Sequence, residues 1–496
     1  MSVLESQTLI ESKTRASRHE LGQFLTPLHV ADFMASLFQT NRDHWDLLDA
    51  GAGTGALTAA FVRRICTMRN KPRSLSVTAF ELDPVMFEAL RDTLAECWRL
   101  CDRTGVAFSS TIRFEDFIEA AAPMAREDLF SNQQLRFNVA IVNPPYRKIR
   151  SDSPTRRILQ SASIETSNLY AGFVALIAKL LIKGGELVAI TPRSFCNGPY
   201  FKPFREDFLK TMSLRRLHVF DSRSAAFSGD NVLQENVIVH AVKDTSKPRQ
   251  VTISTSSGKP RGVVTPRDVN FGDVVHPDDS EQFIHLQVDE RHTEAKSAMS
   301  RLNATLTELG LGISTGRVVD FRATSYLCAQ PVEGAVPLIY PCHFNGGFVH
   351  WPRIPSRKPN AILSNSYTRA LLVPAGVYVL VKRFTAKEER RRIVACIYDS
   401  KRIPAPLIGF ENHLNYFHVG GRGMSLELAK GLVAFLNSTV VDLYFRQFSG
   451  HTQVNATDLR SMSYPTKTAL ESLGRKLDDP GIEQGKLDEL VKKELF

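Results

Sequence analysis

The chain has 496 residues, of which 43% are hydrophobic and 23% are charged, as is typical of a globular protein with two or three domains. This composition excludes a disordered or fibrous chain. No run of 18 uninterrupted apolar residues occurs, and the N-terminal segment lacks the apolar core of a secretory signal, so we expect a cytoplasmic protein that does not cross a membrane. The seven cysteines include no CxxC pair, which predicts neither a disulfide framework nor a structural zinc site.

The formal net charge of +10 is concentrated in the second half of the chain. Residues 311–465 contain 18 Lys and Arg against 9 Asp and Glu, and 13 of these 18 cations are Arg. The planar guanidinium group suits phosphate oxygens and guanine edges. The asymmetry favours a polyanionic partner such as nucleic acid, with a generic basic surface as the alternative.

The first half of the chain alternates short apolar runs with segments of helical periodicity. Strands are expected at 45–51, 76–83, 111–117, 137–143, 186–192, 214–221 and 236–242. Helices are expected between them, among others at 84–101 and at 168–183, the second closed by Gly184 and Gly185. This alternation predicts an α/β fold with a doubly wound parallel sheet that helices cover on both faces.

The rest of the chain divides into a polar segment and an irregular C-terminal part. Residues 243–305 are rich in Ser, Thr, Lys and Asp and show weak periodicity, which indicates a connector. Beyond it, strands are expected at 376–382 and 391–398 and a helical run near 425–447. The predicted organisation is an α/β domain over 1–245, a connector over 246–305 and a mixed α+β domain over 306–496.

The first expected strand ends in a glycine-rich motif, Asp49-Ala50-Gly51-Ala52-Gly53-Thr54-Gly55, directly before a helical segment. Glycines at this place let the backbone turn sharply and approach a ligand at the N-terminus of the helix. The spacing matches nucleotide-binding folds and also the D-x-G-x-G-x-G of S-adenosylmethionine sites. A plain corner between a strand and a helix is the alternative.

Two more acids follow the next two expected strands. Glu81 ends the second strand, where a carboxylate can accept hydrogen bonds from both hydroxyls of a ribose. Asp116 follows the third strand and is placed to reach an adenine amino group. Acids at the carboxyl ends of successive parallel strands line the crevice in which such folds bind ligands, although solvated surface acids are the alternative.

The most specific feature is Asn143-Pro144-Pro145-Tyr146, which follows the apolar run FNVAIV. Because proline fixes its own φ and restrains its predecessor, this segment is rigid. It presents two acceptors, the Asn143 amide oxygen and the Pro144 carbonyl, beside the flat face of Tyr146. Two acceptors and a stacking ring suit a planar exocyclic amine, whereas a simple proline-rich turn is the alternative.

Together, NPPY and DAGAGTG resemble the gamma-class N6-adenine DNA methyltransferases of bacterial restriction–modification systems, with a TaqI-like catalytic domain. The order of motifs agrees, because GQFLTP (22–27) precedes the glycine motif and NPPY follows it. The C-terminal part resembles type II enzymes of the PstI/XhoI kind in four segments: STGRVVDFR (314–322), KRFTAKEERRRIV (382–394), ENHLNY (411–416) and FSGHTQVNATDLR (448–460).

The resemblance implies a Rossmann-like S-adenosylmethionine-dependent methyltransferase domain followed by a DNA-recognition domain. It implies that the cofactor, S-adenosylmethionine, is bound by Thr26, Pro27, Asp49, Gly51, Gly53, Gly55, Glu81 and Asp116. It implies that the target adenine, flipped out of double-stranded DNA, is held by Asn143, Pro144, Pro145, Tyr146 and a second aromatic residue, Phe201, with Tyr200 as its competitor. Cations expected to contact DNA are Arg317, Arg383, Arg390, Arg391 and Arg392.

The chemistry expected from the resemblance is methyl transfer to adenine N6, which protects DNA from a cognate restriction endonuclease. Hydrogen bonds from the amine to Asn143 and Pro144 favour a pyramidal nitrogen whose lone pair is aimed at the methyl group. Neither a metal nor a covalent intermediate is expected. Whether a separate nuclease exists stays open at this point.

The sequence leaves other functions open. The same NPPY serves enzymes that methylate RNA adenine or a glutamine side chain of a protein. A fused restriction–modification enzyme is a further alternative, because Pro277-Asp278 and Glu294-Ala295-Lys296 mimic a nuclease signature. A DNA-binding module without activity is disfavoured by the intact motifs.

Overall fold

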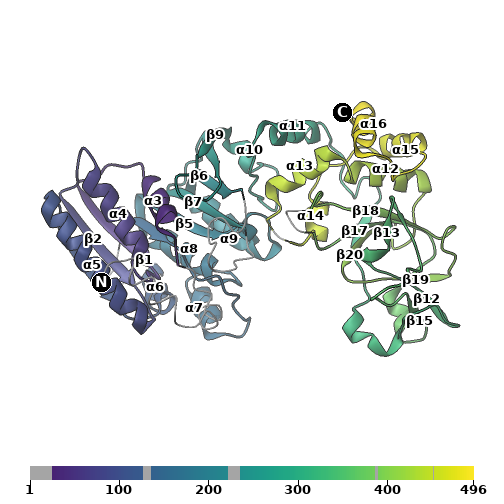
Figure 1. Cartoon of the computed structure of the whole chain (residues 1–496), viewed down its shortest axis with the longest axis horizontal. Coiled ribbons are helices and arrows are strands. Elements are labelled where there is room, and N and C mark those ends of the chain that lie inside the picture. Colours follow the sequence, from purple (N-terminus) through teal and green to yellow (C-terminus); the bar gives the residue numbers. More distant parts are fainter. Residues whose placement is uncertain (1–24, 127–135, 222–234, 386–388, 451) are drawn as a thin grey trace. The chain divides into compact units, whose positions relative to one another are not determined.

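The computed structural model describes residues 25–126, 136–221, 235–385, 389–450 and 452–496. They belong to two compact units, Met1–Val288 and Asp289–Phe496, which are described separately below (Figure 1). The expected motif at residues 22–27 is described from Leu25 onward, and its first three residues lie outside the described part.

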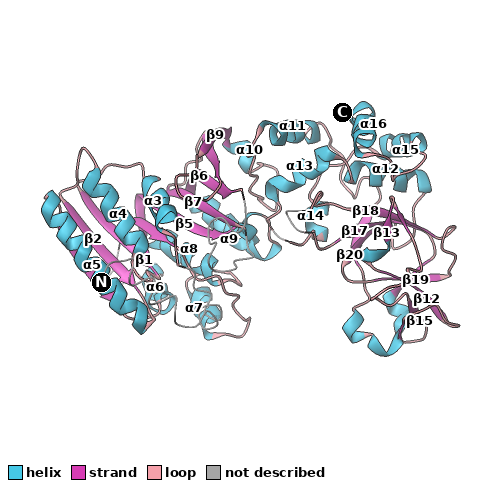
Figure 2. Ribbon diagram, viewed as in Figure 1, coloured by secondary structure: helices cyan, strands magenta, loops and turns pink. Residues whose placement is uncertain are grey.

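Unit 1 is built on a nine-stranded sheet with the order β3-β2-β1-β4-β5-β7-β6-β8-β9 (Figure 2). Its strands are β1 His44–Ala50, β2 Ser74–Phe80, β3 Ala107–Arg113, β4 Phe137–Val142, β5 Leu181–Pro192, β6 Met212–Phe220, β7 Asn236–Lys243, β8 Gln250–Ser256 and β9 Thr265–Asn270.

The first five strands pair in parallel, whereas β7 pairs antiparallel with both β5 and β6. The chain winds outward from β1 to β3 on one side and continues from β4 on the other. The order of the strands therefore reverses between β1 and β4. In open α/β sheets the crevice outside the carboxyl ends of the strands at such a point is the usual binding site.

Helices cover both faces of this sheet, as the alternating apolar side chains of the strands require. On one face, Leu47 of β1 belongs to a core with α3, α4 and α5; on the other, Leu48 belongs to a core with α6, α7, α8 and α9. The helices of unit 1 are α3 Leu28–Ser36, α4 Ala56–Thr67, α5 Pro84–Thr104, α6 Phe117–Ala125, α7 Pro154–Ser161, α8 Leu169–Leu180, α9 Lys202–Thr211 and α10 Phe271–Val274. The predicted α/β class with a doubly wound parallel core is confirmed.

The expected connector differs from the structure. Within 246–288, strands β8 and β9 extend the sheet, β8 pairing in parallel with β6 and β9 antiparallel with β8. Only one face of β8 is strongly apolar, through Val251 and Ile253, and charged residues flank the strand. That short alternation is too weak a signal to indicate a strand from sequence.

The expected helix at 168–183 is also shorter in the structure. Helix α8 ends at Leu180 because Leu181 already pairs with Phe137 of β4. The register between β4 and β5 then shifts before Glu186 pairs with Val139. Gly184, with φ of +75°, lies in this irregular stretch, so the glycine pair marks a bulge rather than the end of a helix.

Unit 2 combines two smaller sheets with a layer of helices. One sheet has the order β10-β20-β17-β18-β14-β13 and the other β11-β15-β12-β19-β16. Their strands are β10 Gly312–Thr315, β11 Leu327–Cys328, β12 Ala335–Ile339, β13 Phe344–Asn345, β14 Phe348–Val349, β15 Ala361–Leu363, β16 Leu372–Pro374, β17 Val377–Lys382, β18 Ala395–Asp399, β19 Leu407–Phe410 and β20 Leu414–His418. Buried aromatic rings of Tyr378, Tyr398, Phe410 and Tyr416 fill the core of the first sheet.

The helices of unit 2 are α11 Glu290–Met299, α12 Leu426–Leu436, α13 Thr439–Phe448, α14 Ala456–Arg460, α15 Lys467–Lys476 and α16 Gln484–Leu495. The run expected near 425–447 is thus two helices. Asn437 separates them because its amide exchanges two hydrogen bonds with the backbone of Ala395, and Ser438 caps α13. Among the described residues no single helix is long and apolar enough to span a membrane, and the bent pair α12–α13 passes that test by length and composition alone.

Candidate functional site

The carboxyl ends of β1, β2, β3 and β4 surround a cavity of about 210 Å³ in unit 1. Six of the residues predicted from sequence line it: Gly51, Gly53, Glu81, Asp116, Asn143 and Pro145. The other lining residues are Leu25, Phe80, Leu82, Met86, Glu115, Phe117, Arg147, Thr155, Leu169 and Phe173. The sheet therefore brings together motifs that lie as far apart as residues 51 and 145.

The glycine motif forms a loop that passes from β1 to α4 at the edge of the cavity. Gly51 and Gly53 have φ of +74° and +57°, a region that favours glycine. Gly55 has φ of +82° and begins α4, but it does not line the cavity. A Cβ atom there would lie 2.9 Å from Leu90 Cδ1, so this glycine lets α4 and α5 pack closely.

Glu81 connects the glycine loop to the loop after β2. Its carboxylate accepts hydrogen bonds from the backbone N–H groups of Gly53 at 2.7 Å, Leu82 at 2.9 Å and Asp83 at 2.8 Å. The side chain is 5% exposed, and this burial raises the pKa of the carboxyl above its ordinary value. Glu81 thus holds two ligand-facing loops in place and also lines the cavity.

Asp49 lies below the glycine loop and is fully buried. Its Oδ2 accepts a hydrogen bond of 2.6 Å from Thr58 Oγ1 of α4, while Oδ1 has no partner among the described residues. Burial, together with the nearby charge of Glu81, raises the pKa of Asp49 to about 7. A buried carboxylate oxygen without a partner is costly, and a cationic ligand group would relieve that cost.

Asp116 caps helix α6 from the loop after β3. Its Oδ1 accepts from the backbone N–H groups of Ile118 at 2.7 Å and Glu119 at 3.1 Å. Because both hydrogen bonds end on the same oxygen, they fix the orientation of the carboxylate. The Asp116 side chain also lines the cavity. Asp116 follows the third strand as predicted, although that strand, expected at 111–117, spans Ala107–Arg113.

Asn143 and Thr26 form a direct contact across the site. Asn143 directly follows β4, and its Nδ2 donates a 2.9 Å hydrogen bond to Thr26 Oγ1, which is 5% exposed. Thr26 precedes helix α3, whose N-cap is Pro27, so the two residues bring the N-terminal motif to NPPY. The hydrogen bond fixes which side of the Asn143 amide carries the nitrogen and which carries the oxygen.

The ring of Tyr146 in NPPY is the first of three aromatic rings that contact one another in series. Tyr146 contacts Tyr170 edge to face with ring centroids 6.2 Å apart, and Tyr170 stacks on Phe201 at 5.4 Å. The Tyr146 hydroxyl donates to the backbone carbonyl of Ile190 at 3.2 Å. Phe201 is 5% exposed whereas Tyr200 is 77% exposed, and neither lines the cavity.

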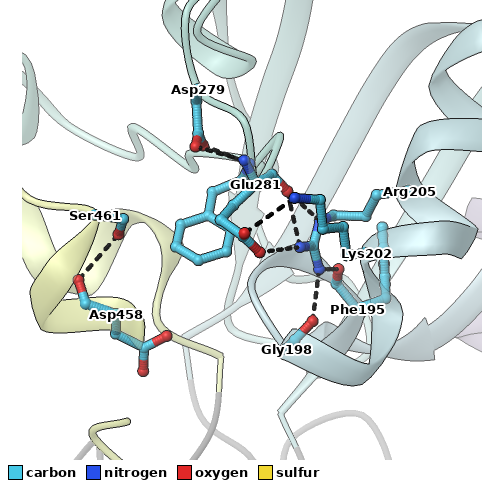
Figure 3. A network of polar contacts seen from close by, with 9 residues as sticks. Phe195, Gly198, Lys202, Arg205, Asp279, Glu281, Asp458 and Ser461 are labelled. Atoms are coloured by element: carbon cyan, nitrogen blue, oxygen red, sulfur yellow. Dashed lines mark hydrogen bonds and ion pairs between the residues drawn. The ribbon is translucent and has the colours of Figure 1, made fainter. Parts of the chain in front are cut away.

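The segment that carries Phe201 is held by a buried arginine (Figure 3). Arg205 donates from Nη1 to the carbonyls of Phe195 at 3.0 Å and Gly198 at 2.8 Å, and from Nε and Nη2 to the carbonyl of Glu281. The Glu281 side chain accepts from Lys202 at 3.1 Å. This network, which no sequence motif indicates, keeps the backbone around Phe201 rigid.

Four of the five arginines expected to contact DNA lie at or near the surface of unit 2. Arg317 and Arg390 are exposed; Arg383 and Arg391 are partly buried, and each donates to a backbone carbonyl. Burial also lowers the pKa of Arg391.

Arg392 is a correction to the expected set. It is 2% exposed, its Nε donates to Thr385 Oγ1 at 3.2 Å, and its guanidinium lies 5.8 Å from the centre of the Phe445 ring. A side chain buried in the core of unit 2 does not reach a phosphate. The run of three arginines is therefore split between surface and core because it leads directly into β18.

The apolar wall of the cavity was missed by the sequence reasoning. Phe117 lies 5.1 Å from Phe80 and 5.0 Å from Phe173 between ring centroids, and Leu82 is 56% exposed. Leu82 and Phe117 each directly follow a predicted acid, Glu81 and Asp116. An apolar residue next to an acid at a strand end was the available signal.

The comparisons with known proteins agree with this geometry. A family model described as Eco57I restriction-modification methylase matches residues 81–227. The type II methyltransferase M.PstI of Providencia stuartii is 44% identical over 478 residues, which cover 96% of this chain and 93% of that protein. The chain belongs to the type II DNA methyltransferases of restriction–modification systems.

Another member of this family, M.BsuBI of Bacillus subtilis, is 43% identical with the same coverage. Among solved structures, the cryo-EM structure of a DrdV–DNA complex matches with a TM-score of 0.51 at 12% identity, covering 95% of this chain and 58% of that chain. LlaBIII bound to DNA matches with a TM-score of 0.50 at 11% identity, covering 96% and 40%. These two likenesses concern the fold.

Members of such a family use S-adenosylmethionine, and the cavity fits that cation. Glu81, a buried acid with a raised pKa, lines it, and Asp49, a second such acid, lies in β1 two residues before the lining residue Gly51 and has one oxygen without a partner among the described residues. Apolar rings of Phe80, Phe117 and Phe173 supply a wall for an adenine ring.

The raised pKa of Asp49 predicts a pH-dependent loss of stability in the cofactor-free protein. Between its ordinary value of 3.8 and about 7, the folded state keeps a proton that the unfolded state releases. Stability therefore falls as pH rises through this window, by at most about 4 kcal/mol, and is constant above it. Asp49→Asn removes the titration, so its melting temperature relative to wild type should be higher at pH 7.5 than at pH 5. An equal difference at both pH values would contradict this prediction.

Proposed function

We propose that the protein transfers a methyl group from S-adenosylmethionine to N6 of an adenine in double-stranded DNA. The observation that carries the proposal is the position of Asn143 and Pro145 on the wall of the same cavity as the glycine loop, Glu81 and Asp116. In this proposal the enzyme acts in the bacterial cytoplasm, and its methylation protects a site from a separate cognate restriction endonuclease. No metal takes part.

Each end of the cofactor has a matching group in the cavity. Asp49 and the backbone of Gly51 and Gly53 face its methionine part, the Glu81 carboxylate accepts from its ribose, and Asp116 accepts from its adenine amine. Since Asp116 Oδ1 already accepts two backbone N–H groups, Oδ2 is the oxygen for that amine. When bound, S-adenosylmethionine supplies an electrophilic methyl group.

The target amine is held by two acceptors of NPPY. Because Thr26 fixes the nitrogen of the Asn143 amide, the amide oxygen is presented in a set direction next to the Pro144 carbonyl. Hydrogen bonds from N6–H to these oxygens draw the nitrogen lone pair out of conjugation with the ring. Transfer then depends on orientation, which a rigid Asn-Pro-Pro segment provides.

The adenine has to leave the duplex to reach this site, since a base inside the stack is inaccessible. Unstacking costs a few kcal/mol, which stacking on Tyr146 partly offsets. The ring of Tyr170, which itself stacks on Phe201, packs against the Tyr146 ring and holds it in place. Phe201 as a second face on the base remains a prediction, with Tyr200 as its exposed competitor.

Methyl transfer is tested directly with labelled S-adenosylmethionine and duplex DNA. Label should enter the DNA, and nucleoside mass spectrometry should find it as N6-methyladenine. RNA of the same sequence and an intact protein substrate with an exposed glutamine serve as parallel samples. Label in either of these and none in DNA would overturn the proposal.

Asn143→Ala should reduce methyl transfer by about 100- to 1,000-fold, the range for removal of one preorganised partner of a transition state. Single-turnover kinetics on duplex DNA measure this effect. The dissociation constant for S-adenosylmethionine, measured by calorimetry, should stay within about twofold of wild type. Thr26→Val, which removes only the acceptor for the Asn143 amide, should give a smaller loss. Near-normal turnover of Asn143→Ala would refute the amine-binding role.

Tyr146→Ala should lower turnover by about 5- to 100-fold, because base–aromatic stacking contributes about 1–3 kcal/mol. Tyr146→Phe keeps the ring and loses the hydroxyl that donates the 3.2 Å hydrogen bond to Ile190, so it should remain close to wild type. Turnover and DNA affinity are compared for the two variants. Equal damage by Phe and Ala would mean that the hydroxyl, not the ring, is required.

Glu81→Ala should weaken binding of S-adenosylmethionine by at least about tenfold, because it removes the ribose acceptor and releases the backbone of Gly53. Calorimetry without DNA measures the dissociation constant. Asp83→Ala is the matched control, since Asp83 caps α5 next to Glu81 and does not line the cavity. A constant unchanged in Glu81→Ala, or changed equally in both variants, would contradict the assignment.

A further inference from the structure

Segments from all four C-terminal motifs converge at one end of the sheet β10-β20-β17. We name this region the loop cluster and define it as residues 316–322, 383–385, 411–413 and 452–454. The sheet explains why they meet: Thr315 ends β10, Lys382 ends β17, and Leu414 begins β20, which pairs antiparallel with both. Three of the segments therefore adjoin the sheet at the same end, and residues 452–454 join them through hydrogen bonds with 383–385.

Hydrogen bonds between the loops hold the cluster together. Asn412 N–H donates to the Val318 carbonyl at 2.9 Å, and Arg383 N–H donates to the His413 carbonyl at 2.8 Å. Val454 N–H donates to the Arg383 carbonyl at 2.7 Å. A surface formed by four chain segments in fixed register is preorganised, which limits the entropy lost on binding.

Several side chains at the surface of the loop cluster are of the types that recognise base edges in DNA. Arg317 is exposed, and Arg383, Asn412, His413 and Gln453 are partly buried. Arg suits the O6 and N7 atoms of guanine, and Asn and Gln suit N6 and N7 of adenine. The Asn412 side chain is partly exposed, but its Oδ1 is a buried atom without a hydrogen-bond partner among the described residues, a cost that contact with a donor would relieve.

Two aromatic side chains of the cluster are exposed among these polar groups. Phe384 is 43% exposed and lies 4.8 Å from the His413 ring, and Phe321 is 73% exposed with the Arg322 guanidinium 5.5 Å from its centre. Exposed rings beside arginines suit thymine methyl groups or unstacked base steps.

The acids of the cluster already have partners among the described residues. Asp320 pairs with Lys358 at 2.8 Å, and the buried Glu411 lies 2.5 Å from His413 Nδ1. The charge offered outward is therefore that of Arg317, Arg322 and Arg383, which complements a polyanion. We propose that the loop cluster is the surface of unit 2 that reads the base sequence of duplex DNA, through Arg317, Asn412 and Gln453. This inference rests on the proposed DNA methyl transfer and specifies where its site preference originates.

The test measures site preference in the full-length protein. Wild type and variants methylate a duplex library, and single-molecule sequencing records methylation at the wild-type site and at sites with one mismatch. Arg317→Ala, Asn412→Ala and Gln453→Ala should each lower the ratio between the two by about 10- to 100-fold, the effect of losing one base contact. Arg317→Lys keeps the charge but not the planar fork, so it should also lose preference while retaining the salt dependence of binding.

Arg422→Ala is the matched control, because Arg422 is an exposed arginine beyond His418, at the opposite end of the same sheet. It should keep the wild-type preference, and all variants should keep the wild-type melting temperature and affinity for S-adenosylmethionine. Unchanged preference in the three alanine variants, or an equal loss in Arg422→Ala, would overturn the inference. A wild type that methylates no DNA would overturn the proposed function instead; fluorescence anisotropy with duplex DNA would then decide the cluster, with weaker binding in the alanine variants supporting it and unchanged binding refuting it.

Discussion

The cavity of unit 1 depends on one buried carboxylate, that of Glu81. Its two oxygens accept backbone N–H groups from two loops, the glycine loop after β1 and the loop after β2. Without this acceptor the three backbone amides of Gly53, Leu82 and Asp83 would need other partners. The same carboxylate lines the cavity, so the group that shapes the site is also part of its wall. This arrangement explains why an acid stands at the end of β2 rather than a neutral cap.

The parallel sheet supplies the second condition, because it gathers strand ends without requiring the loops to be near in sequence. β1 and β4 are neighbours although about ninety residues separate them, and the strand order reverses between them. Asp49 and Asn143 therefore end up on either side of the point of reversal. One is a fully buried acid with an oxygen lacking a partner among the described residues, and the other an amide oriented by Thr26. The buried acid suits a cationic methyl donor, and the oriented amide suits an amine that accepts the methyl group.

Much of this site could be predicted from sequence because its residues stand in rigid local contexts. Asn143 follows a fully buried strand and precedes two prolines, and Glu81 and Asp116 follow strands whose ends meet in any parallel sheet. The part of the apolar wall that Phe173 forms could not be predicted, since this residue comes from the middle of α8 and its role depends on how that helix packs. The burial of Arg392 could not be predicted either, because it ends a run of three arginines. The pairing of β8 with β6 could not be predicted either, because the polar sequence of β8 does not indicate a strand.

Unit 2 shows the limit of such reasoning most clearly, because antiparallel pairing between distant strands decides which loops meet. Thr315 pairs with Asn415, one hundred residues later, and Lys382 pairs with Leu414. No local pattern encodes these partners, so four motifs can be seen in the sequence without any sign that they share a surface. Once the pairing is known, the consequence is physical. Exposed side chains on these loops, such as that of Arg317, are not packed into a core, so they can differ without disturbing the sheet that holds them. In unit 1, by contrast, Glu81 cannot change without altering the two loops whose backbone it holds.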